Sequence, residues 1–329
     1  MTGSSLRGSR ILITGGAGFI GSHIADQLLA AEVDHITVID DFERGCSRNL
    51  SEACASGRVQ LVQGDIRDAA LVDALTAGAD YVFHQAALRI TQCAAEPQKA
   101  LEVMAVATQH VLDSAVRHGV KKVLAASSAS VYGEPSYLPM DEAHPFNNRT
   151  LYGATKIANE QMFRSYAEMF GLQYIMLRPF NIYGPRMDVF GAYTEVMIRW
   201  LERLREGQQP VIFGDGAQTM DFLYVEDLAR AYVLAAESDA TDIVLNAGSG
   251  VETSLLELCT ELCAAAGQPE AMPEFQAPRA VNPVTRRQAS TELAREVLGF
   301  EASTPLSEGL SRLIAWHRDV TEQPLVAAK

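Results

Sequence analysis

Residues 10–21 read Arg10-Ile-Leu-Ile-Thr-Gly-Gly-Ala-Gly-Phe-Ile-Gly21, an apolar run that passes directly into closely spaced glycines. The apolar run predicts a β-strand that ends at Thr14, and the apolar periodicity from Ser22 to Ala31 predicts a helix. Glycines in such a turn let the backbone approach a pyrophosphate, and the helix N-terminus offers unpaired N–H groups to its charge. This stretch therefore predicts a dinucleotide-binding site, although a glycine-rich turn in an ordinary α/β protein is the alternative.

A second predicted strand, residues 35–39, leads into Asp40 and Asp41. These acids follow Gly21 by about 20 residues, the separation at which such folds place a carboxylate on the adenine ribose. A carboxylate there binds the ribose 2′-hydroxyl and repels a 2′-phosphate. We therefore expect NAD rather than NADP as the cofactor.

Strands and helices continue to alternate along the first half of the chain. Strands are predicted at 59–62, 81–84, 122–126 and 173–177, and helices at 69–77, 97–118 and from Tyr152 to about 170. This alternation predicts an α/β fold of the Rossmann type, a doubly wound parallel sheet that binds ligands at the carboxyl ends of its strands. Ser127 and Ser128 follow the 122–126 strand and are expected there.

Beyond residue 180 the alternation weakens. The pattern there predicts a helix near 194–206, a strand at 211–213, a helix at 225–237, a strand at 243–245 and two more helices. We therefore divide the chain into a flexible N-terminus (1–9), an NAD-binding Rossmann domain with the Tyr/Lys helix (10–180) and a smaller, mostly C-terminal substrate-binding region (181–329). The segment near 211–247 is expected to return in part to the Rossmann sheet.

Tyr152 and Lys156 lie four residues apart in Leu151-Tyr-Gly-Ala-Thr-Lys156. This spacing places a phenol and an ammonium group on one helix face. A fixed cation stabilises a phenolate and lowers the tyrosine pKa, which would make Tyr152 a usable base. Taken alone, the pattern also fits a solvated helix surface.

Composition limits the possible partners and location. The formal net charge of −14 over 329 residues argues against nucleic acid or an anionic membrane as a partner. The five cysteines show no C-x-x-C spacing, so neither a disulfide framework nor a metal site is expected. With no signal-peptide core and no apolar stretch long enough to span a bilayer, the sequence predicts a soluble, cytoplasmic protein.

Taken together, the motifs resemble the extended short-chain dehydrogenase/reductases that act on nucleotide sugars, and among them the UDP-sugar 4-epimerases. The resemblance covers residues 10 to about 318 and rests on motifs that occur in that family's order: Gly15-x-x-Gly18-x-x-Gly21, Asp40, Gly64-Asp65-Ile66, Ala86-Ala87, Ser127-Ser128, Val131-Tyr132-Gly133, Tyr152-x-x-x-Lys156, Phe180-Asn181-x-Tyr183-Gly184-Pro185, Gly214-Asp-Gly216, Asp221-Phe222 and Asp227.

The resemblance implies roles for individual residues. Ser128 would hydrogen-bond the reacting sugar hydroxyl, Tyr152 would be the base, and Lys156 would bind the nicotinamide ribose and lower the tyrosine pKa. Asn181 would contact the sugar nucleotide. Cofactor contacts are expected from Gly15, Gly18, Phe19, Ile20, Gly21, Asp40, Asp41, Asp65, Ile66, Ala86, Ala87, Tyr152 and Lys156, and Arg89 would serve cofactor or substrate phosphate, with a surface arginine as the alternative.

The pair after Ser128 separates the activities of the family. Dehydratases carry Asp-Glu there and glucuronate decarboxylases keep the Glu, whereas this chain has Ala129 and Ser130. The resemblance thus implies epimerisation at C4 through a 4-keto sugar that is reduced again on its other face. A 4,6-dehydratase or another NAD-dependent oxidoreductase is the alternative enzyme, and a non-catalytic NAD-binding protein is the alternative outside enzymes.

The sequence also departs from the family pattern. Met220 stands where the family usually has an arginine for the substrate pyrophosphate, so another cation is expected to replace it. Arg279 matches a second phosphate-binding arginine, and Arg286 and Arg287 are further candidates, with solvated loop charges as the alternative. Relatives pair the helices near 97–118 and 152–170 across a two-fold axis, which implies a homodimer.

Overall fold

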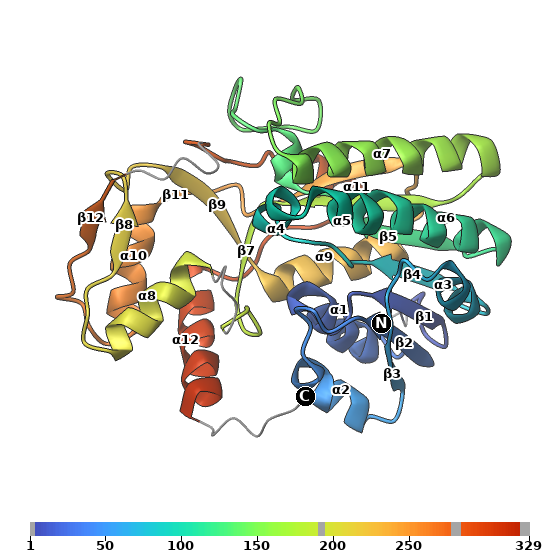
Figure 1. Ribbon diagram of the computed structural model, residues 1–329, viewed down its shortest axis with the longest axis horizontal. Coiled ribbons are helices and arrows are strands. Elements are labelled where there is room, and N and C mark those ends of the chain that lie inside the picture. The colour runs from blue at the N-terminus through green and yellow to red at the C-terminus, as the bar shows by residue number, and fades with distance from the viewer. Residues whose placement is uncertain (1–3, 190–194, 278–283, 323–329) are drawn as a thin grey trace.

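The central element is a seven-stranded, wholly parallel sheet with the order β10-β6-β5-β4-β1-β2-β3. The computed structural model describes residues 4–189, 195–277 and 284–322. The strand order reverses between β1 and β4, which is the switch point where such sheets bind ligands. The predicted Rossmann-type sheet is confirmed, with strands β1 Arg10–Thr14, β2 His35–Asp40, β3 Val59–Gln63, β4 Tyr81–His84, β5 Lys122–Ala126, β6 Tyr174–Pro179 and β10 Ile243–Ala247 (Figure 1).

Helices cover both faces of this sheet, which explains why β6 is buried along its whole length. One face packs against α1 Phe19–Ala30, α2 Ser51–Ala55, α9 Val225–Glu237 and α11 Glu292–Leu298. The other packs against α3 Ala69–Thr76, α6 Ala107–Arg117 and α7 Leu151–Phe170. Two separate apolar cores result, one on each side of the sheet.

The helix predicted at 97–118 has an irregular middle. It runs as α5 Pro97–Leu101, a π-helical turn over Glu102–Val106 and then α6, and the short helix α4 Ile90–Ala95 precedes it. A π turn adds a residue to the helical repeat and rotates the side chains that follow it. The buried side chain of Met104 lies within this turn.

A smaller lobe stands beside the carboxyl ends of the sheet (Figure 1). Its three-stranded sheet has the order β11-β9-β7, and its two-stranded sheet pairs β12 with β8. Trp200, Leu258 and Leu313 belong to its apolar core. Its elements are β7 Asn181–Tyr183, α8 Val196–Arg205, β8 Val211–Phe213, β9 Thr219–Tyr224, β11 Glu252–Ser254, α10 Leu255–Ala265, β12 Glu274–Gln276 and α12 Leu306–Glu322.

Two details differ from the pattern expected after residue 180. Within the segment 211–247, β10 is an edge strand of the large sheet and α9 packs on one face of that sheet. β8 belongs to the small lobe because its partner strand is β12. In the part of the chain that the structure describes, three helices follow β10 instead of two, since α11 and α12 are separate. The flexibility expected for residues 1–9 and the domain boundary expected at residue 180 remain predictions.

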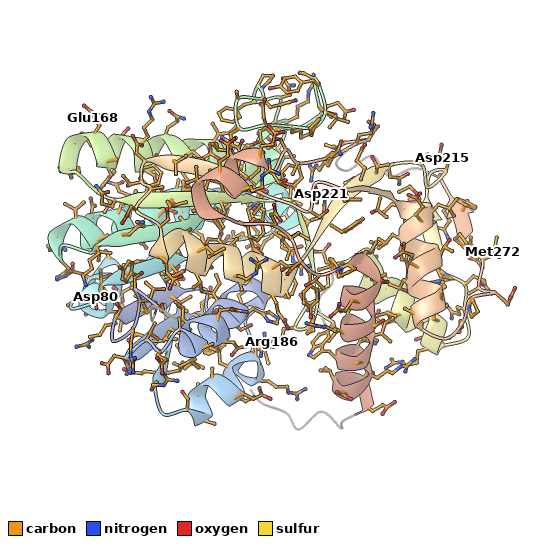
Figure 2. All side chains as sticks on the ribbon, turned by 180° about the vertical axis from the view of Figure 1, so that it is seen from behind. Asp80, Glu168, Arg186, Asp215, Asp221 and Met272 are labelled. Carbon is orange, nitrogen blue, oxygen red and sulfur yellow. The ribbon has the colours of Figure 1, made fainter. Side chains whose placement is uncertain are left out.

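Asp221 on β9 ties several segments of the lobes together, and Figure 2 labels it at their junction. Its buried carboxylate accepts hydrogen bonds from the backbone N–H groups of Ser249 (2.7 Å), Gly250 (2.9 Å) and Ala289 (3.0 Å). Its carbonyl oxygen accepts from the Asn181 amide at 3.1 Å.

Within the described residues, no helix has the length and apolarity that a bilayer-spanning segment requires.

Candidate active site

A cavity of about 490 Å³ opens at the carboxyl ends of the large sheet, next to the small lobe. That volume lies in the range of ligand-binding sites. The structure brings most of the expected site residues to its wall. They are Gly15, Gly18, Phe19, Ile20, Gly21, Asp40, Asp41, Asp65, Ile66, Ala86, Ala87, Arg89, Ser128, Tyr152, Lys156 and Asn181.

The glycine turn between β1 and α1 fits a closely approaching ligand. Gly15 has φ +68°, and a Cβ on it would lie 2.6 Å from the backbone nitrogen of Ala86. A Cβ on Gly21 would lie 2.5 Å from the carbonyl oxygen of Gly15. No side chain caps α1 at Gly18, so the first N–H groups of this helix remain available to an anion in the cavity.

Asp40 is held in a fixed orientation at the end of β2. Its carboxylate accepts hydrogen bonds from the N–H groups of Ala17 (3.0 Å) and Phe42 (2.9 Å). Burial raises the pKa of Asp40, and these two bonds oppose that rise. A carboxylate has about four acceptor sites, so lone pairs are left for ribose hydroxyls.

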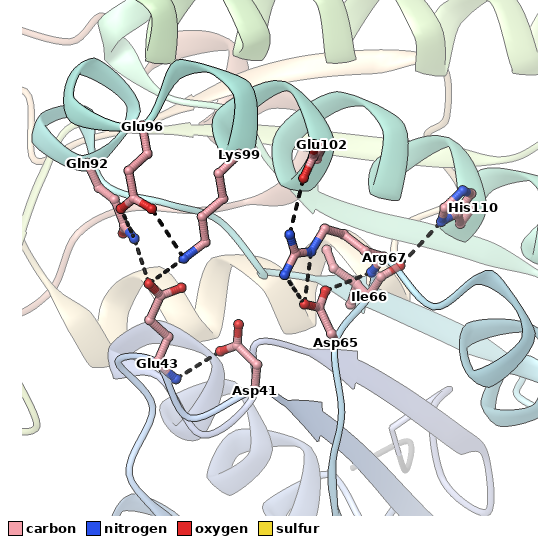
Figure 3. A network of polar contacts seen from close by, with 10 residues as sticks. All are labelled: Asp41, Glu43, Asp65, Ile66, Arg67, Gln92, Glu96, Lys99, Glu102 and His110. Atoms are coloured by element: carbon pink, nitrogen blue, oxygen red, sulfur yellow. Dashed lines mark hydrogen bonds and ion pairs between the residues drawn. The ribbon is translucent and has the colours of Figure 1, made fainter.

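Ion pairs join the neighbouring loops to the helix that begins at α5, as Figure 3 shows. Glu43 is bound by Lys99 at 2.5 Å. Arg67 donates from Nε to Asp65 at 2.9 Å and reaches Glu102 at 3.2 Å. The hydrogen bond from Arg67 is the largest influence on Asp65 and lowers the pKa of that carboxyl. The two loops that carry the expected adenosine contacts are therefore braced by the same helix.

Ser128, Tyr152 and Lys156 converge on one part of the cavity. Lys156 donates from Nζ to the carbonyl oxygen of Ala126 at 2.6 Å and lies 5.7 Å from the centre of the Tyr152 ring. Burial lowers the pKa of Lys156 to about 8. Burial also raises the pKa of Tyr152, while the hydrogen bond with Ser128 lowers it.

Two arginines lower the pKa of Tyr152, an effect that the sequence led us to expect from Lys156 alone. After burial and the bond with Ser128, the charges of Arg44 and Arg287 lower the Tyr152 pKa. The ammonium group of Lys156 is instead directed to Ala126. Sequence reasoning missed Arg44, although its place three residues after Asp41, in the loop that follows β2, is a usable signal.

A buried polar network fixes the backbone beneath Ser128. Arg178 donates to Glu160 through Nε at 2.8 Å and Nη2 at 2.7 Å. Ser127 also donates to Glu160, and the Tyr132 hydroxyl accepts from Arg178 at 2.8 Å. The end of β5 is thereby anchored one residue before Ser128.

The substrate-side arginines are placed differently from the expectation. Arg286 does not line the cavity; it is exposed and donates from Nε to Glu252 at 3.0 Å. Its neighbour Arg287 lines the cavity and is buried. The two side chains point oppositely because the backbone is extended here and Arg287 donates its N–H to Thr219 at 3.0 Å. Arg279 lies outside the described residues.

Two carboxylates at the edge of the small lobe form ion pairs with the cavity arginines Arg44 and Arg89. Asp188 lies 3.9 Å from Arg44 and 3.8 Å from Arg89. Glu195 lies 3.8 Å from the same arginine, Arg89. Arg89 is therefore an inward, charge-paired residue and not a surface arginine.

The positions after Ser128 carry no acid. Ala129 is buried in an apolar cluster with Tyr132 and Phe180, and Ser130 lines the cavity. A hydroxyl of ordinary acidity cannot supply the proton transfers that a carboxyl group performs.

Comparison with known proteins agrees with this arrangement. The model of the NAD dependent epimerase/dehydratase family matches residues 11–248. A UDP-glucose 4-epimerase of Mycolicibacterium smegmatis is 36% identical over 316 residues, which are 95% of this chain and 100% of that protein. A dTDP-glucose 4,6-dehydratase of Actinoplanes is 32% identical, over 94% of this chain and 98% of the relative.

A solved structure is also similar along nearly its whole length. It is a UDP-N-acetylglucosamine 4-epimerase from Methanobrevibacter ruminantium in complex with UDP-N-acetylmuramic acid, with TM-score 0.90 and 29% identity, covering 96% of this chain and 100% of that one. The glycine turn, the Asp40 carboxylate and the fold explain the family match, and NAD is the cofactor. This chain belongs to the NAD dependent epimerase/dehydratase family of extended short-chain dehydrogenase/reductases.

Proposed function

We propose that this enzyme inverts C4 of a nucleotide-sugar, most readily a UDP-sugar. The observation that carries the proposal is one cavity that holds Ser128, Tyr152 and Lys156 beside the glycine turn, without an acid after Ser128. Ser128, Tyr152 and Lys156 together suffice for proton transfer at one hydroxyl group of the sugar. It lacks the second acid that elimination of water from C5 and C6 would need.

In this reaction Tyr152 takes the proton from the 4-hydroxyl, and Ser128 hydrogen-bonds the same oxygen. NAD, when bound, supplies the hydride acceptor and later the hydride donor for C4. The 4-keto sugar then turns over in the cavity, and Tyr152 returns the proton to the 4-oxygen. One proton and one hydride leave and return, so the cycle needs no net oxidant.

The pKa of Tyr152 is raised overall because burial is the largest influence on it, but the cavity also holds groups that favour its ionised form. Burial alone would hold Tyr152 in its neutral form, which cannot accept a proton. The hydrogen bond with Ser128 and the charges of Arg44 and Arg287 oppose that effect. Lys156 is oriented by Ala126 and is available to a ribose hydroxyl.

The test is incubation of the purified protein with UDP-, dTDP-, GDP- and CDP-sugars without added NAD. The expected result is a mixture of two C4 epimers by NMR, with no build-up of absorbance at the NADH band. Failure with every sugar, while NAD is bound, would overturn the proposal.

The second candidate is a 4,6-dehydratase, because a relative of that name is as widely similar to the chain as the epimerase. It predicts a stable 4-keto product that has lost water. The same NMR experiment separates the two, since dehydration converts the C6 hydroxymethyl group into a methyl group and a C4 epimer keeps it.

We also infer a homodimer. Leu101 is 46% and Val106 is 49% exposed on the α5–α6 helix, and Met169 is 61% exposed on α7. These two helices lie side by side on one face of the molecule (Figure 1). Exposed apolar side chains on adjacent helices are typical of a surface that another subunit covers.

A further inference from the structure

Loop 41–46, which follows β2, runs along the wall of the cavity and is attached at both of its ends. At its start, the Asp40 carboxylate accepts a backbone hydrogen bond of 2.9 Å from the loop. At its other end, the N–H of Cys46 donates to the carbonyl oxygen of Ala17 in the glycine turn at 3.0 Å. Its middle residues, 43–45, line the cavity. The loop therefore forms the wall next to the carboxylate expected to bind the adenine ribose.

From the middle of this loop, the side chain of Glu43 reaches two donors on the neighbouring helices. Lys99 on α5 donates from Nζ at 2.5 Å, and Gln92 on α4 donates from Nε2 at 2.7 Å (Figure 3). Glu96 accepts from Gln92 at 3.2 Å and lies 3.8 Å from the ammonium group of Lys99. Glu96 thereby orients both donors toward the loop. We call Glu43, Gln92 and Lys99 the loop latch.

The ion pair within the loop latch is partly shielded from water. Only 25% of the Lys99 side chain and 35% of the Glu43 side chain are exposed. The hydrogen bond with Glu43 raises the pKa of Lys99, so the pair is charged at neutral pH. A fully exposed ion pair contributes little to holding two segments together. A shielded pair with a second donor on the same carboxylate contributes more.

The loop latch acts on the loop and not on a ligand. Glu43 lines the cavity, but Lys99 and Gln92 do not. Their contacts join protein groups to one another, so they stabilise the closed position of loop 41–46 equally with or without a ligand beside it. Such a contact slows the entry and the exit of a ligand alike and leaves its affinity nearly unchanged.

We propose that the loop latch retains NAD by holding loop 41–46 closed beside the adenosine half of the cofactor. The proposal rests on NAD as the cofactor and goes beyond the proposed C4 epimerisation. In that reaction the hydride taken from C4 returns to it within one cycle, so no step requires the cofactor to leave. NAD and NADH are expected to be retained alike, because they differ only in the nicotinamide ring and the latched loop follows Asp40.

Release of NAD from the holoenzyme measures the latch without any substitution. Protein loaded with radiolabelled NAD is mixed with an excess of unlabelled NAD, and the label that stays bound is followed with time. High salt weakens a partly exposed ion pair, because the screening length falls to about 3 Å at 1 M. Wild-type release is expected to be at least about 3-fold faster at about 1 M than at about 0.05 M NaCl. Equal or slower release at high salt would overturn the proposal, even if no variant folds.

Variants locate the effect. Lys99→Met and Glu43→Gln are each expected to speed NAD release by about 10-fold, because each weakens charge-assisted bonds in a partly exposed contact. The Kd for NAD, measured by calorimetry, should stay within about 3-fold of the wild-type value. The double variant should release NAD as fast as either single variant, since both substitutions break the same contact. Lys99→Arg keeps the charge and should restore slow release.

Lys121→Met is the matched control. Lys121 pairs with Asp80 at 2.8 Å, and these residues directly precede β5 and β4 at the amino ends of the strands, opposite the cavity. The control removes one ammonium group from one ion pair, as Lys99→Met does. Its NAD release and its response to salt should equal those of the wild-type protein.

The outcomes separate the latch from other roles of the same residues. Wild-type release by Lys99→Met would overturn the latch. A loss of NAD affinity as large as the gain in release rate would also overturn it, because Lys99 and Glu43 would then stabilise the bound cofactor itself. Neither readout needs turnover. Absence of epimerisation with every sugar, together with faster NAD release by Lys99→Met, would overturn the proposed function and leave the latch standing.

Discussion

Glu160 and Arg178 face one another in the core below Ser128, joined by hydrogen bonds of 2.8 and 2.7 Å, with only 3% and 4% of their side chains exposed. Removing one partner of such a pair leaves an uncompensated buried charge. We predict that Arg178→Met lowers the free energy of unfolding by about 3–5 kcal/mol in urea titrations. The double variant Arg178→Met/Glu160→Met should recover most of the loss, and equal destabilisation by the single and double variants would contradict the prediction.

Tyr152→Phe removes the hydroxyl that we assign as base and keeps the ring. Epimerisation should fall by about 100-fold to 10,000-fold, because general acid–base catalysis contributes a factor of this size. NAD measured in the denatured supernatant should remain at the wild-type ratio. Tyr137→Phe is the control, since Tyr137 is exposed and bonded to Asp141 at 2.7 Å. Wild-type turnover by Tyr152→Phe would favour a non-catalytic role for this helix.

His84 links β1 to α6, with Thr14 at 2.7 Å and Thr108 at 3.0 Å from its ring nitrogens. Burial, aided by the charge of Lys156, lowers its pKa from 6.5 to about 3. Between these values the unfolded chain binds a proton that the folded chain does not. The free energy of unfolding should therefore decrease as pH falls from 6.5 toward 3, by up to about 1.4 kcal/mol per pH unit.

Urea titrations between pH 7 and pH 4.5 check this slope. His84→Gln should be less stable at pH 7 and lose less stability on acidification. His23, whose pKa burial lowers to about 4, should add a slope of the same sign. An unchanged slope in the double variant His23→Gln/His84→Gln would contradict the prediction.

Gly21→Ala should weaken NAD binding by at least about 10-fold, since a factor of ten corresponds to only 1.4 kcal/mol. The new Cβ would lie 2.5 Å from Gly15 O and 2.7 Å from Gly16 Cα, and backbone atoms cannot yield as a flexible side chain can. Calorimetry with NAD measures the loss. Gly119→Ala is the control, because it meets nothing within 4 Å and should cost stability through its φ of +64° without changing NAD affinity.

Light scattering at micromolar concentration tests the inferred dimer. The wild-type protein should show twice the chain mass of 35.7 kDa. Leu101→Glu/Val106→Glu should shift the mass to that of one chain, because charged side chains would be buried unpaired between subunits. A wild-type monomer would refute the homodimer.

The sequence predicted those parts of the fold whose signal is local. β1, the glycine turn and the helix of Tyr152 combine periodicity, turn chemistry and length, and the structure confirms each. The strands β7, β9, β11 and β12 were missed. β7, β11 and β12 have three residues each, which leaves little periodicity to detect, and the six-residue β9 pairs with β7 and β11, which are not adjacent to it in the sequence.

The sequence also predicted those site residues that directly follow a predicted strand or lie on a predicted helix. Gly15, Asp40 and Tyr152 follow predicted elements directly, so their common cavity could be expected. Arg286 and Arg287 are adjacent in an extended segment, where a shift of one residue exchanges the inner and outer faces. Only the pairing with Thr219 shows which of the two arginines enters the cavity.

The place of β10 and α9 in the large sheet has a consequence for synthesis on the ribosome. β10 forms the sheet edge beside β6, and α9 covers the face of the sheet that α1 also covers. A nascent chain that has emerged only as far as α7 and β6 therefore exposes an unpaired strand edge and an uncovered apolar surface. Both attract other chains, so the growing polypeptide is more prone to aggregate until residue 247 has left the exit tunnel.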